Sequence, residues 1–290
     1  MSDRATVLYD APGPRARMRN RVLTVVCAVV VLAALYFVYA KFDAKGQWAA
    51  AKWTPFLQGD VWVNYLLSGL LNTLTAAVLG SVFAMIFGVV FGIARLSTWA
   101  WIRLPAGAVV EVFRAIPLLM LIFFILTGSY PLFGVFTDPL TAVVGGLTLY
   151  NGSVIAEIVR AGINAVPKGQ SEAAQSIGLR PGEVMRSVLL PQAITAMMPA
   201  IVSQLIILLK DSALGFIVAF PELVSQSKIA GNFFGNVIPT MIVVAIIYII
   251  VNFLLGRFAN WLERRNARRG RGSAAAPAAA GVDLEVTPGV

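Results

Sequence analysis

Six long apolar stretches constrain this chain more than any other feature of its sequence. They cover residues 22–40, 64–94, 105–128, 140–159, 193–220 and 237–256. An α-helix rises 1.5 Å per residue, so about 20 apolar residues cross about 30 Å of hydrocarbon, and each stretch is about that long or longer. Backbone amides inside a membrane need internal partners, and these stretches are too long and continuous for barrel strands. The sequence therefore predicts an all-α integral membrane protein with six transmembrane helices.

The composition agrees with a membrane protein and excludes several kinds of chemistry. Hydrophobic residues make up 58% of the chain and charged residues 13%, whereas a soluble domain is about 45–50% apolar and about 25% charged. Histidine is absent, and the single cysteine, Cys27, lies inside the first apolar stretch. Disulfides, Cys/His metal sites and histidine-based acid–base catalysis are thus excluded within this chain. We expect no catalytic residue, metal site or cofactor in it.

The basic residues predict how the chain is oriented. If the N-terminus is cytoplasmic, 17 of the 23 Lys and Arg residues fall in segments on the cytoplasmic side and four fall outside. The other two, Arg114 and Lys210, lie within apolar stretches. By the positive-inside rule, both termini are cytoplasmic and the spans number six. The formal net charge of +9 is then an orientation signal with contact to anionic lipid, and it does not indicate nucleic-acid binding.

The two ends of the chain differ from its middle. We expect residues 1–20 to be a disordered cytoplasmic segment, residues 21–41 to form the first transmembrane helix, and the Ala-, Gly- and Pro-rich residues 270–290 to be a disordered cytoplasmic tail. The first stretch could instead be a cleaved signal peptide, which would leave five spans. Its 19-residue apolar core exceeds the usual length of about 7–15 residues, so we expect a retained anchor.

The longest hydrophilic segment between spans, residues 160–192, contains repeated signals for helix starts and stops. Ser171 is a predicted N-cap, with Glu172 in the first turn and Gly178 at the end of a short helix. Pro181 suits the first position of a second short helix, and Pro191 is expected to interrupt the backbone before the fifth span. The segment therefore predicts a compact helical elbow of the kind used for docking.

This elbow also carries a spaced motif. Its fixed positions are Glu172, Ala173, Ala174, Gly178, Val188, Leu190 and Pro191. The motif resembles the EAA loop of ABC importer permeases, which reads E-A-A, three residues, G, nine residues, I, one residue, L-P. Val188 is the one departure, in place of isoleucine. The alternative is an ordinary interfacial helical hairpin, which would not require this set of residues at these spacings.

The resemblance extends over residues 64–262 and includes further segments of the polar amino-acid branch of these permeases. Residues 156–162 read AEIVRAG, residues 209–212 read LKDS, and residues 111–117 read EVFRAIP. In the last segment, Ala115 and Ile116 replace the Gly-Thr of the family. The resemblance implies a type I ABC importer permease core of five helices, preceded here by one extra N-terminal helix, with a cytoplasmic coupling helix.

The resemblance also implies partners. The chain has no G-x-x-x-x-G-K-[ST] loop, so ATP and Mg²⁺ are expected on two separate ATPase subunits rather than on this chain. The coupling residues implied by the family are Glu172, Ala173, Ala174, Gly178, Leu190 and Pro191. We also expect a second permease subunit, in a homodimer or heterodimer, and an extracellular or periplasmic substrate-binding protein. The location implied is the bacterial plasma membrane.

Ionisable residues within the apolar stretches are candidates for the substrate pathway, because a charge in mid-span is costly unless it is paired or hydrated. Arg114 is expected near the midplane, and Glu111, one turn earlier, could pair with it. Two alternatives stay open for Arg114: contact with a substrate carboxylate, or membership of a structural pair. Lys210 and Asp211 are adjacent and have either a pathway role or a snorkelling one. Glu157 and Arg160, three residues apart, favour a structural pair.

Two other classes of function compete with the importer permease. An ion- or proton-coupled secondary transporter could use the same intramembrane charges, but it would leave the elbow unexplained, and no inverted repeat is evident in the sequence. A membrane enzyme would need clustered carboxylates, histidines or a metal set, which the chain does not offer. The expected activity is uptake of a polar amino acid. The chain as a whole, with its extra first span, most resembles glutamate-uptake permeases, which implies glutamate as the substrate, and an arginine at the midplane suits an acidic substrate.

Overall fold

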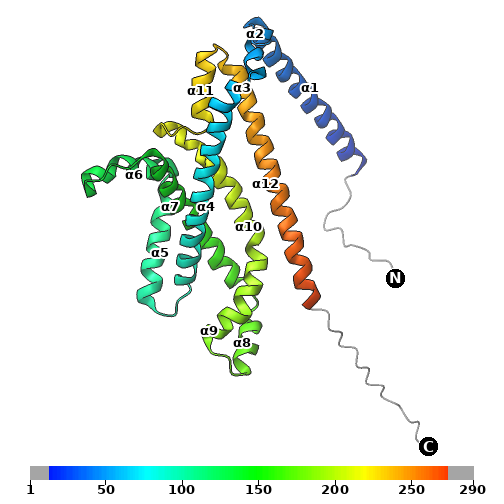
Figure 1. Cartoon of the computed structure of the whole chain (residues 1–290). Helices are drawn as coiled ribbons and strands as arrows, with labels where there is room; N and C mark the ends of the chain where they lie inside the picture. Colours follow the sequence, from blue (N-terminus) through cyan, green and yellow to red (C-terminus); the bar gives the residue numbers. More distant parts are fainter. Residues whose placement is uncertain (1–12, 274–290) are drawn as a thin grey trace, which may run out of the picture.

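The computed structural model describes residues 13–273, and these residues form helices joined by short turns, with no strand among them (Figure 1). The long helices are α1 (Pro14–Ala44), α4 (Ser68–Ala94), α5 (Ala100–Ala115), α6 (Leu118–Phe133), α7 (Pro139–Asn164), α10 (Leu190–Asp211) and α12 (Val237–Ser273). The short elements are α2 (Ala50–Trp53), η1 (Thr54–Leu57), α3 (Gly59–Val61), η2 (Trp62–Leu67), α8 (Lys168–Ser176), α9 (Pro181–Val184), η3 (Met185–Leu189), η4 (Ser212–Val218) and α11 (Leu223–Phe233).

The predicted all-α membrane architecture is confirmed. Within the described residues, five helical segments are long and apolar enough to cross a membrane, and the pair α5 and α6 makes a sixth if it counts as one span. The five segments are Pro14–Ala44, Gly59–Ala94, Pro139–Asn164, Pro181–Val218 and Val237–Phe258. Figure 1 shows α4, α7, α10 and α12 running along one bundle, with α8 and α9 at one end and α11 at the other.

The third predicted span, residues 105–128, is wrong as one continuous helix. Helices α5 and α6 meet at an angle of 100°, because Ile116 and Pro117 are extended, with ψ values of 129° and 135°. Proline has no N–H to continue the helix, and its ring disfavours helical backbone at the residue before it. Arg114 therefore lies in the last turn of α5 rather than in the middle of a span.

Small residues allow α4 and α7 to pack closely along most of their length. Gly80, Gly88 and Gly92 lie on one face of α4 at helical spacing, and all three are buried. A Cβ at position 88 would lie 2.4 Å from Ile155 Cγ2, and a Cβ at position 92 would lie 2.8 Å from Val159 Cβ. Close packing of small residues is a main source of helix association in membranes, so this face fixes the centre of the fold.

Helix α11 is attached to the other end of the bundle by hydrogen bonds. The fully buried Glu222 carboxylate accepts hydrogen bonds from the Val224 N–H at 2.8 Å and the Ser225 N–H at 2.6 Å. The Leu223 N–H donates to Thr73 Oγ1 of α4 at 3.0 Å. The Tyr248 hydroxyl of α12 donates to Glu222 at 3.3 Å. These bonds satisfy the first N–H groups of α11, which its own helix leaves unpaired.

The predicted segment boundaries change at both ends. Helix α1 begins at Pro14, so residues 14–20 are helical and not disordered as predicted, and α1 extends beyond the predicted bounds of 21–41. Helix α12 continues to Ser273, so residues 270–273 are helical as well. The rest of the two predicted disordered segments lies outside the described residues. Helix α1 has no buried residue and leans away from the bundle in Figure 1.

Candidate functional site

The predicted elbow forms between α7 and α10. Helix α8 runs from Lys168 to Ser176, and Gly178 then turns the chain with a φ of +89°. Glycine reaches this left-handed region without the steric cost of a Cβ, so its use as a helix exit is confirmed. Pro181 begins α9, and Glu183 Oε2 accepts a hydrogen bond from the Arg180 N–H at 2.8 Å. The elbow lies at the end of the bundle in Figure 1.

Two local predictions for the elbow are wrong. Ser171 is not the N-cap, because α8 begins at Lys168 and the Ser171 hydroxyl donates to the Lys168 carbonyl at 2.8 Å inside the helix. Pro191 does not interrupt the backbone, because α9, η3 and α10 run into one another within the segment Pro181–Val218. Pro191 lies in the first turn of α10, where its missing N–H is tolerated.

The residues of the spaced motif divide into an exposed group and an anchoring group. Glu172, Ala173 and Gly178 are exposed, whereas Ala174 is buried against the elbow itself. Leu190 packs against the main hydrophobic core. Gln192 Nε2 of α10 donates to Gln170 Oε1 of α8 at 3.2 Å. The exposed face of the elbow is therefore joined to the transmembrane helix α10 by packing and by a hydrogen bond.

Sequence reasoning missed Ile177, which is 78% exposed beside Gly178 at the end of α8. An aliphatic side chain this exposed, next to the exposed Glu172 and Ala173 on the same short helix, suits contact with another protein. Its sequence signal was an isoleucine immediately before the helix-ending glycine in an otherwise polar segment.

An ion cluster connects α4, α5 and α7 near the elbow end. Glu157 Oε2 lies 2.9 Å from Arg95 Nη1 and 3.7 Å from Arg114 Nη1. Glu157 Oε1 accepts a hydrogen bond from Arg160 Nε at 3.1 Å. Glu111 Oε1 lies 3.3 Å from Arg95 Nη2. One carboxylate, that of Glu157, thus contacts arginines from three helices.

The pairings within this cluster confirm one prediction and correct another. Glu157 and Arg160 form the expected pair three residues apart. Among the described residues, however, Arg114 pairs with Glu157 and Glu111 pairs with Arg95, so the pair predicted between Glu111 and Arg114 does not form. The reason is that the Arg95 side chain, at the end of α4, contacts both Glu111 of α5 and Glu157 of α7 and is just 13% exposed.

A second polar region surrounds Lys210. A cavity of about 570 Å³ is lined by Lys210, Ala213, Val224, Tyr248, Ile249 and Asn252. Lys210 and Asp211 form no ion pair with a described residue; Lys210 is exposed to the cavity, whereas Asp211 lies outside the cavity lining and has Asn151 as a hydrogen-bond partner. The buried Asn252 Oδ1 likewise accepts no hydrogen bond from the described part of the chain. The cavity therefore combines the cation of α10 with the polar side chains of Tyr248 and Asn252 on α12.

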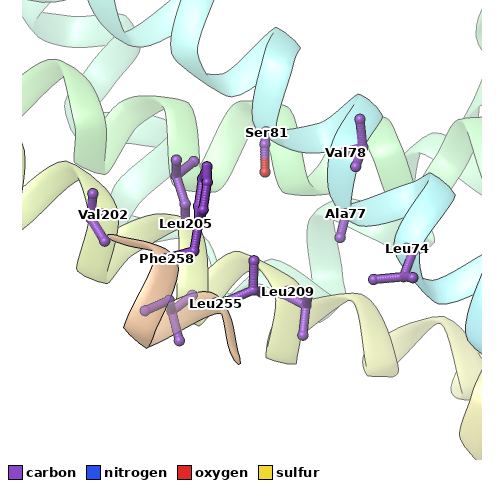
Figure 2. Close-up of a pocket in the computed structure, with 10 residues that line it drawn as sticks. Leu74, Ala77, Val78, Ser81, Val202, Leu205, Leu209, Leu255 and Phe258 are labelled. Atoms are coloured by element: carbon purple, nitrogen blue, oxygen red, sulfur yellow. The ribbon is translucent and has the colours of Figure 1, made fainter. Parts of the chain in front are cut away.

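An apolar cavity of about 300 Å³ lies between α4, α10 and α12 (Figure 2). Figure 2 shows Leu74, Val78 and Leu205 pointing into the space, with Ser81 as the hydroxyl-bearing residue among its lining. A cavity with this lining offers almost nothing to bind a charged or polar solute, because such a solute would lose its hydration without replacement hydrogen bonds. The polar region around Lys210 is the better candidate for solute contact.

These features define an integral membrane permease: a bundle of membrane-crossing helices, charged groups within it, and a helical elbow exposed at one end. Residues 84–268 match the family described as "Binding-protein-dependent transport system inner membrane component". The chain therefore belongs to this family, the permeases of ABC importers.

Individual relatives agree with this assignment. The chain is 42% identical to the glutamate transport system permease protein GluD of Corynebacterium glutamicum, over 79% of this chain and 84% of that protein. It is 32% identical to the arginine transport system permease protein ArtQ of Bacillus subtilis, over 70% of this chain and 93% of that one. A crystal structure of an amino acid ABC transporter with histidines superposes with a TM-score of 0.67 at 32% identity, covering 72% and 98% of the two chains.

Proposed function

We propose that this chain is the permease subunit of an ABC importer for polar amino acids and that its substrate is glutamate. The observation that carries the proposal is the exposed elbow helix α8, with Glu172, Ala173 and Ile177 on its surface. The glutamate assignment rests on the identity of 42% to a glutamate permease over 79% of the chain. Arginine and glutamine permeases also match at 32–36% identity, so substrate preference is the finer part of the proposal.

The proposed assembly contains two permease subunits, two ATPase subunits that hold ATP and Mg²⁺, and an external substrate-binding protein. The second permease is either a copy of this chain or a similar chain. The protein lies in the plasma membrane with both termini cytoplasmic, which places the elbow on the side where ATP is available. An orientation with the elbow outside would separate it from the ATPase. The side on which the elbow lies can be tested with a cysteine introduced at position 173 and a membrane-impermeant thiol reagent.

In the proposed coupling mechanism, the elbow helix α8 docks in a groove of the ATPase. Glu172 offers a carboxylate to a basic or amide group, Ala173 permits close approach, and Ile177 fills an apolar pocket. Movement of the ATPase then passes to α10, because Leu190 packs into the core and Gln170 is bonded to Gln192. Ala174, which faces its own chain, keeps α8 in place.

Affinity purification from native membranes tests this coupling. The wild-type chain should bring down a P-loop ATPase, and Glu172→Lys should lose it while the chain remains inserted. The matched control is Asp43→Lys, which makes the same charge change at an exposed residue next to the end of α1. Retention of the ATPase and of uptake by Glu172→Lys would refute the docking role.

The proposed solute route passes the charged groups of Lys210, Asp211 and Arg114. Lys210 contacts the substrate carboxylate in the cavity of about 570 Å³, and Asn252 Oδ1 is available to accept a hydrogen bond from the substrate ammonium group. Arg114 is a second contact for the substrate carboxylate. Its side chain is 43% exposed, and its contact with Glu157 is long, at 3.7 Å. Asp211 would contact the ammonium group, while Glu111 and Glu157 hold the arginines in place.

Transport by the reconstituted complex tests the route. Lys210→Gln should lower glutamate uptake at least about tenfold, because a hydrogen bond to a charged group contributes about 1.5–3 kcal/mol. Glutamine uptake, if measurable, should fall less than glutamate uptake if the side-chain carboxylate meets Lys210. Lys45→Gln, at an exposed residue outside the cavity, is the control. Equal effects of the two variants would exclude Lys210 from the route.

A further inference from the structure

A separate cavity at the elbow end of the bundle is lined mainly by arginines. It has a volume of about 390 Å³ and lies between the end of α4, the first half of α5 and the end of α7. Its lining comprises Arg95, Arg103, Leu104, Gly107, Ala108, Glu111 and Arg160. Gly107 helps to keep the space open, since even a Cβ at this position would meet nothing closer than Arg95 Nε at 3.9 Å.

The charges of this cavity do not cancel. Arg95 and Arg160 share the Glu157 carboxylate, and Arg95 also contacts Glu111. Arg103 is exposed and forms no ion pair with any acid in the described range 13–273. The guanidinium groups of Arg95, Arg103 and Arg160 therefore line the cavity together with one carboxylate, that of Glu111. A second carboxylate, that of Glu157, contacts Arg95 and Arg160 from outside the lining. An oxyanion that accepts hydrogen bonds from Arg103 and from the free edge of Arg160 would complete the charge balance.

The surroundings of the cavity suit an amphiphile. Leu104, Ala108 and Val112 follow one another at four-residue intervals up the exposed face of α5, and the first two also line the cavity. Leu104 is 65% exposed and Val112 is 53% exposed. An acyl chain could lie along this face while its headgroup occupies the cavity.

Two tryptophans lie at the start of α5, between two arginines of the cavity lining in sequence. Trp99 and Trp101 are 60% and 72% exposed, and their rings stack with centroids 5.7 Å apart. Exposed tryptophan is enriched where a protein crosses the membrane–water interface. Their position between Arg95 and Arg103 in the sequence puts the arginines at headgroup depth.

We propose that this cavity binds the anionic headgroup of a phospholipid from the cytoplasmic leaflet, with Arg103 as its main contact. Basic pockets between transmembrane helices on the cytoplasmic side are suited to such headgroups. The shared chemistry is that of an oxyanion, and free phosphate and free glutamate are the alternative sources. Neither of them would make use of the apolar face from Leu104 to Val112.

Native mass spectrometry of the full-length chain, purified in detergent, tests the proposal with four probes added separately: phosphatidylglycerol, phosphatidylcholine, inorganic phosphate and glutamate. We expect phosphatidylglycerol to bind at least about tenfold more tightly than phosphatidylcholine, and neither small anion to displace it at millimolar concentration. Arg103→Gln should weaken phosphatidylglycerol binding about tenfold, because it removes a charge-assisted contact at an exposed site.

Two further variants complete the test. Gly107→Leu fills the cavity without changing charge and should weaken phosphatidylglycerol binding as well. Arg257→Gln removes an exposed arginine from α12, where Arg257 lies over the Phe253 ring, and should leave binding unchanged. Equal binding of the two lipids, or equal binding by wild type and Arg103→Gln, would overturn the proposal. Displacement by phosphate or glutamate would make the cavity a small-anion site and would also overturn it.

Discussion

Two glutamates, one at each end of the bundle, hold helices together by different means. Glu157 lies near the elbow, is 25% exposed, and contacts arginines of α4, α5 and α7. Glu222 lies at the other end, is fully buried, and receives hydrogen bonds from two backbone N–H groups and a tyrosine hydroxyl. The first carboxylate is neutralised by cations, whereas neutral donors surround the second.

This difference determines how each end should respond to change. The Glu157 cluster depends on charge, is partly open to water, and has several partners that can substitute for one another. The Glu222 site depends on geometry, because two of its three donors are backbone N–H groups fixed at the start of α11. Loss of the Glu222 carboxylate should therefore cost more stability than loss of the Glu157 charge, even though fewer charges are involved.

The largest effect is expected for Glu222→Ala. It leaves two part-buried backbone N–H groups and the Tyr248 hydroxyl without their carboxylate acceptor, at about 1–3 kcal/mol for each group left unsatisfied. We expect a loss of about 3 kcal/mol, which lowers the unfolding temperature by about 6–12 °C in a thermal melt followed by tryptophan fluorescence. Glu222→Gln keeps one acceptor oxygen and should lose less than half as much. A wild-type melting temperature for Glu222→Ala would contradict the assigned role.

A smaller effect is expected for Glu157→Gln. The change removes the charge that Arg95, Arg114 and Arg160 share, and because the cluster is partly exposed we expect a loss of about 1–2 kcal/mol in the same thermal melt. Added salt should lower the melting temperature of wild type more than that of the variant, since salt screens the exposed part of the cluster. The control, Glu111→Gln, changes a 70% exposed side chain and should shift stability by at most about 0.5 kcal/mol.

The pH dependence of stability should also distinguish the two ends. Burial raises the pKa of the Glu222 carboxyl above its ordinary value of 4.5. Between pH 4.5 and the pKa of the folded state, the folded chain binds more protons at Glu222 than the unfolded chain does. The contribution of Glu222 to the free energy of unfolding therefore falls as the pH rises through this range. Melting temperatures of wild type and Glu222→Gln, compared across this range, should converge as the pH rises. A parallel pair of curves would show that Glu222 does not titrate in this window.

The smallest change in stability is expected for Arg114→Gln. Its contact with Glu157 is 3.7 Å long and its side chain is 43% exposed, so the free energy of unfolding should change by at most about 0.5 kcal/mol. If Arg114 contacts substrate, the same variant should still reduce glutamate uptake by the reconstituted complex about tenfold or more. A variant with normal uptake and a marked loss of stability would make Arg114 a structural residue of the Glu157 cluster.

Several features of the site could be predicted because they depend on neighbouring residues. Gly178 and Pro181 set the exits and starts of the elbow helices through backbone preferences alone, and both lie where predicted. Glu157 and Arg160 lie three residues apart on one helix, so their contact needs no knowledge of the fold. The N-cap predicted at Ser171 is a local error, since α8 begins at Lys168 with Pro167 as its N-cap.

Other features could not be predicted because they depend on which helices meet. Glu111 pairs with Arg95 instead of Arg114, because the end of α4 lies beside α5 and α7. Glu222 lies between two apolar stretches, where the sequence alone predicts no role for it, although it is fully buried. Its burial arises from the contact of α11 with α4 and α12, helices far from each other in sequence. Likewise, the lining of the cavity with Arg103 comes from three helices.

The sequence by itself determined that this chain crosses a membrane as helices and carries a helical elbow, because hydropathy and the spacing of Gly and Pro act over short distances. Pro117 was also present in the sequence as a break, but the 100° angle between α5 and α6 belongs to the packed structure. The tertiary structure alone decided which partners Arg95, Arg114 and Glu222 take. A charge in a low-dielectric interior is paired with whatever donor or acceptor the packing of small residues on α4 and α7 brings within reach.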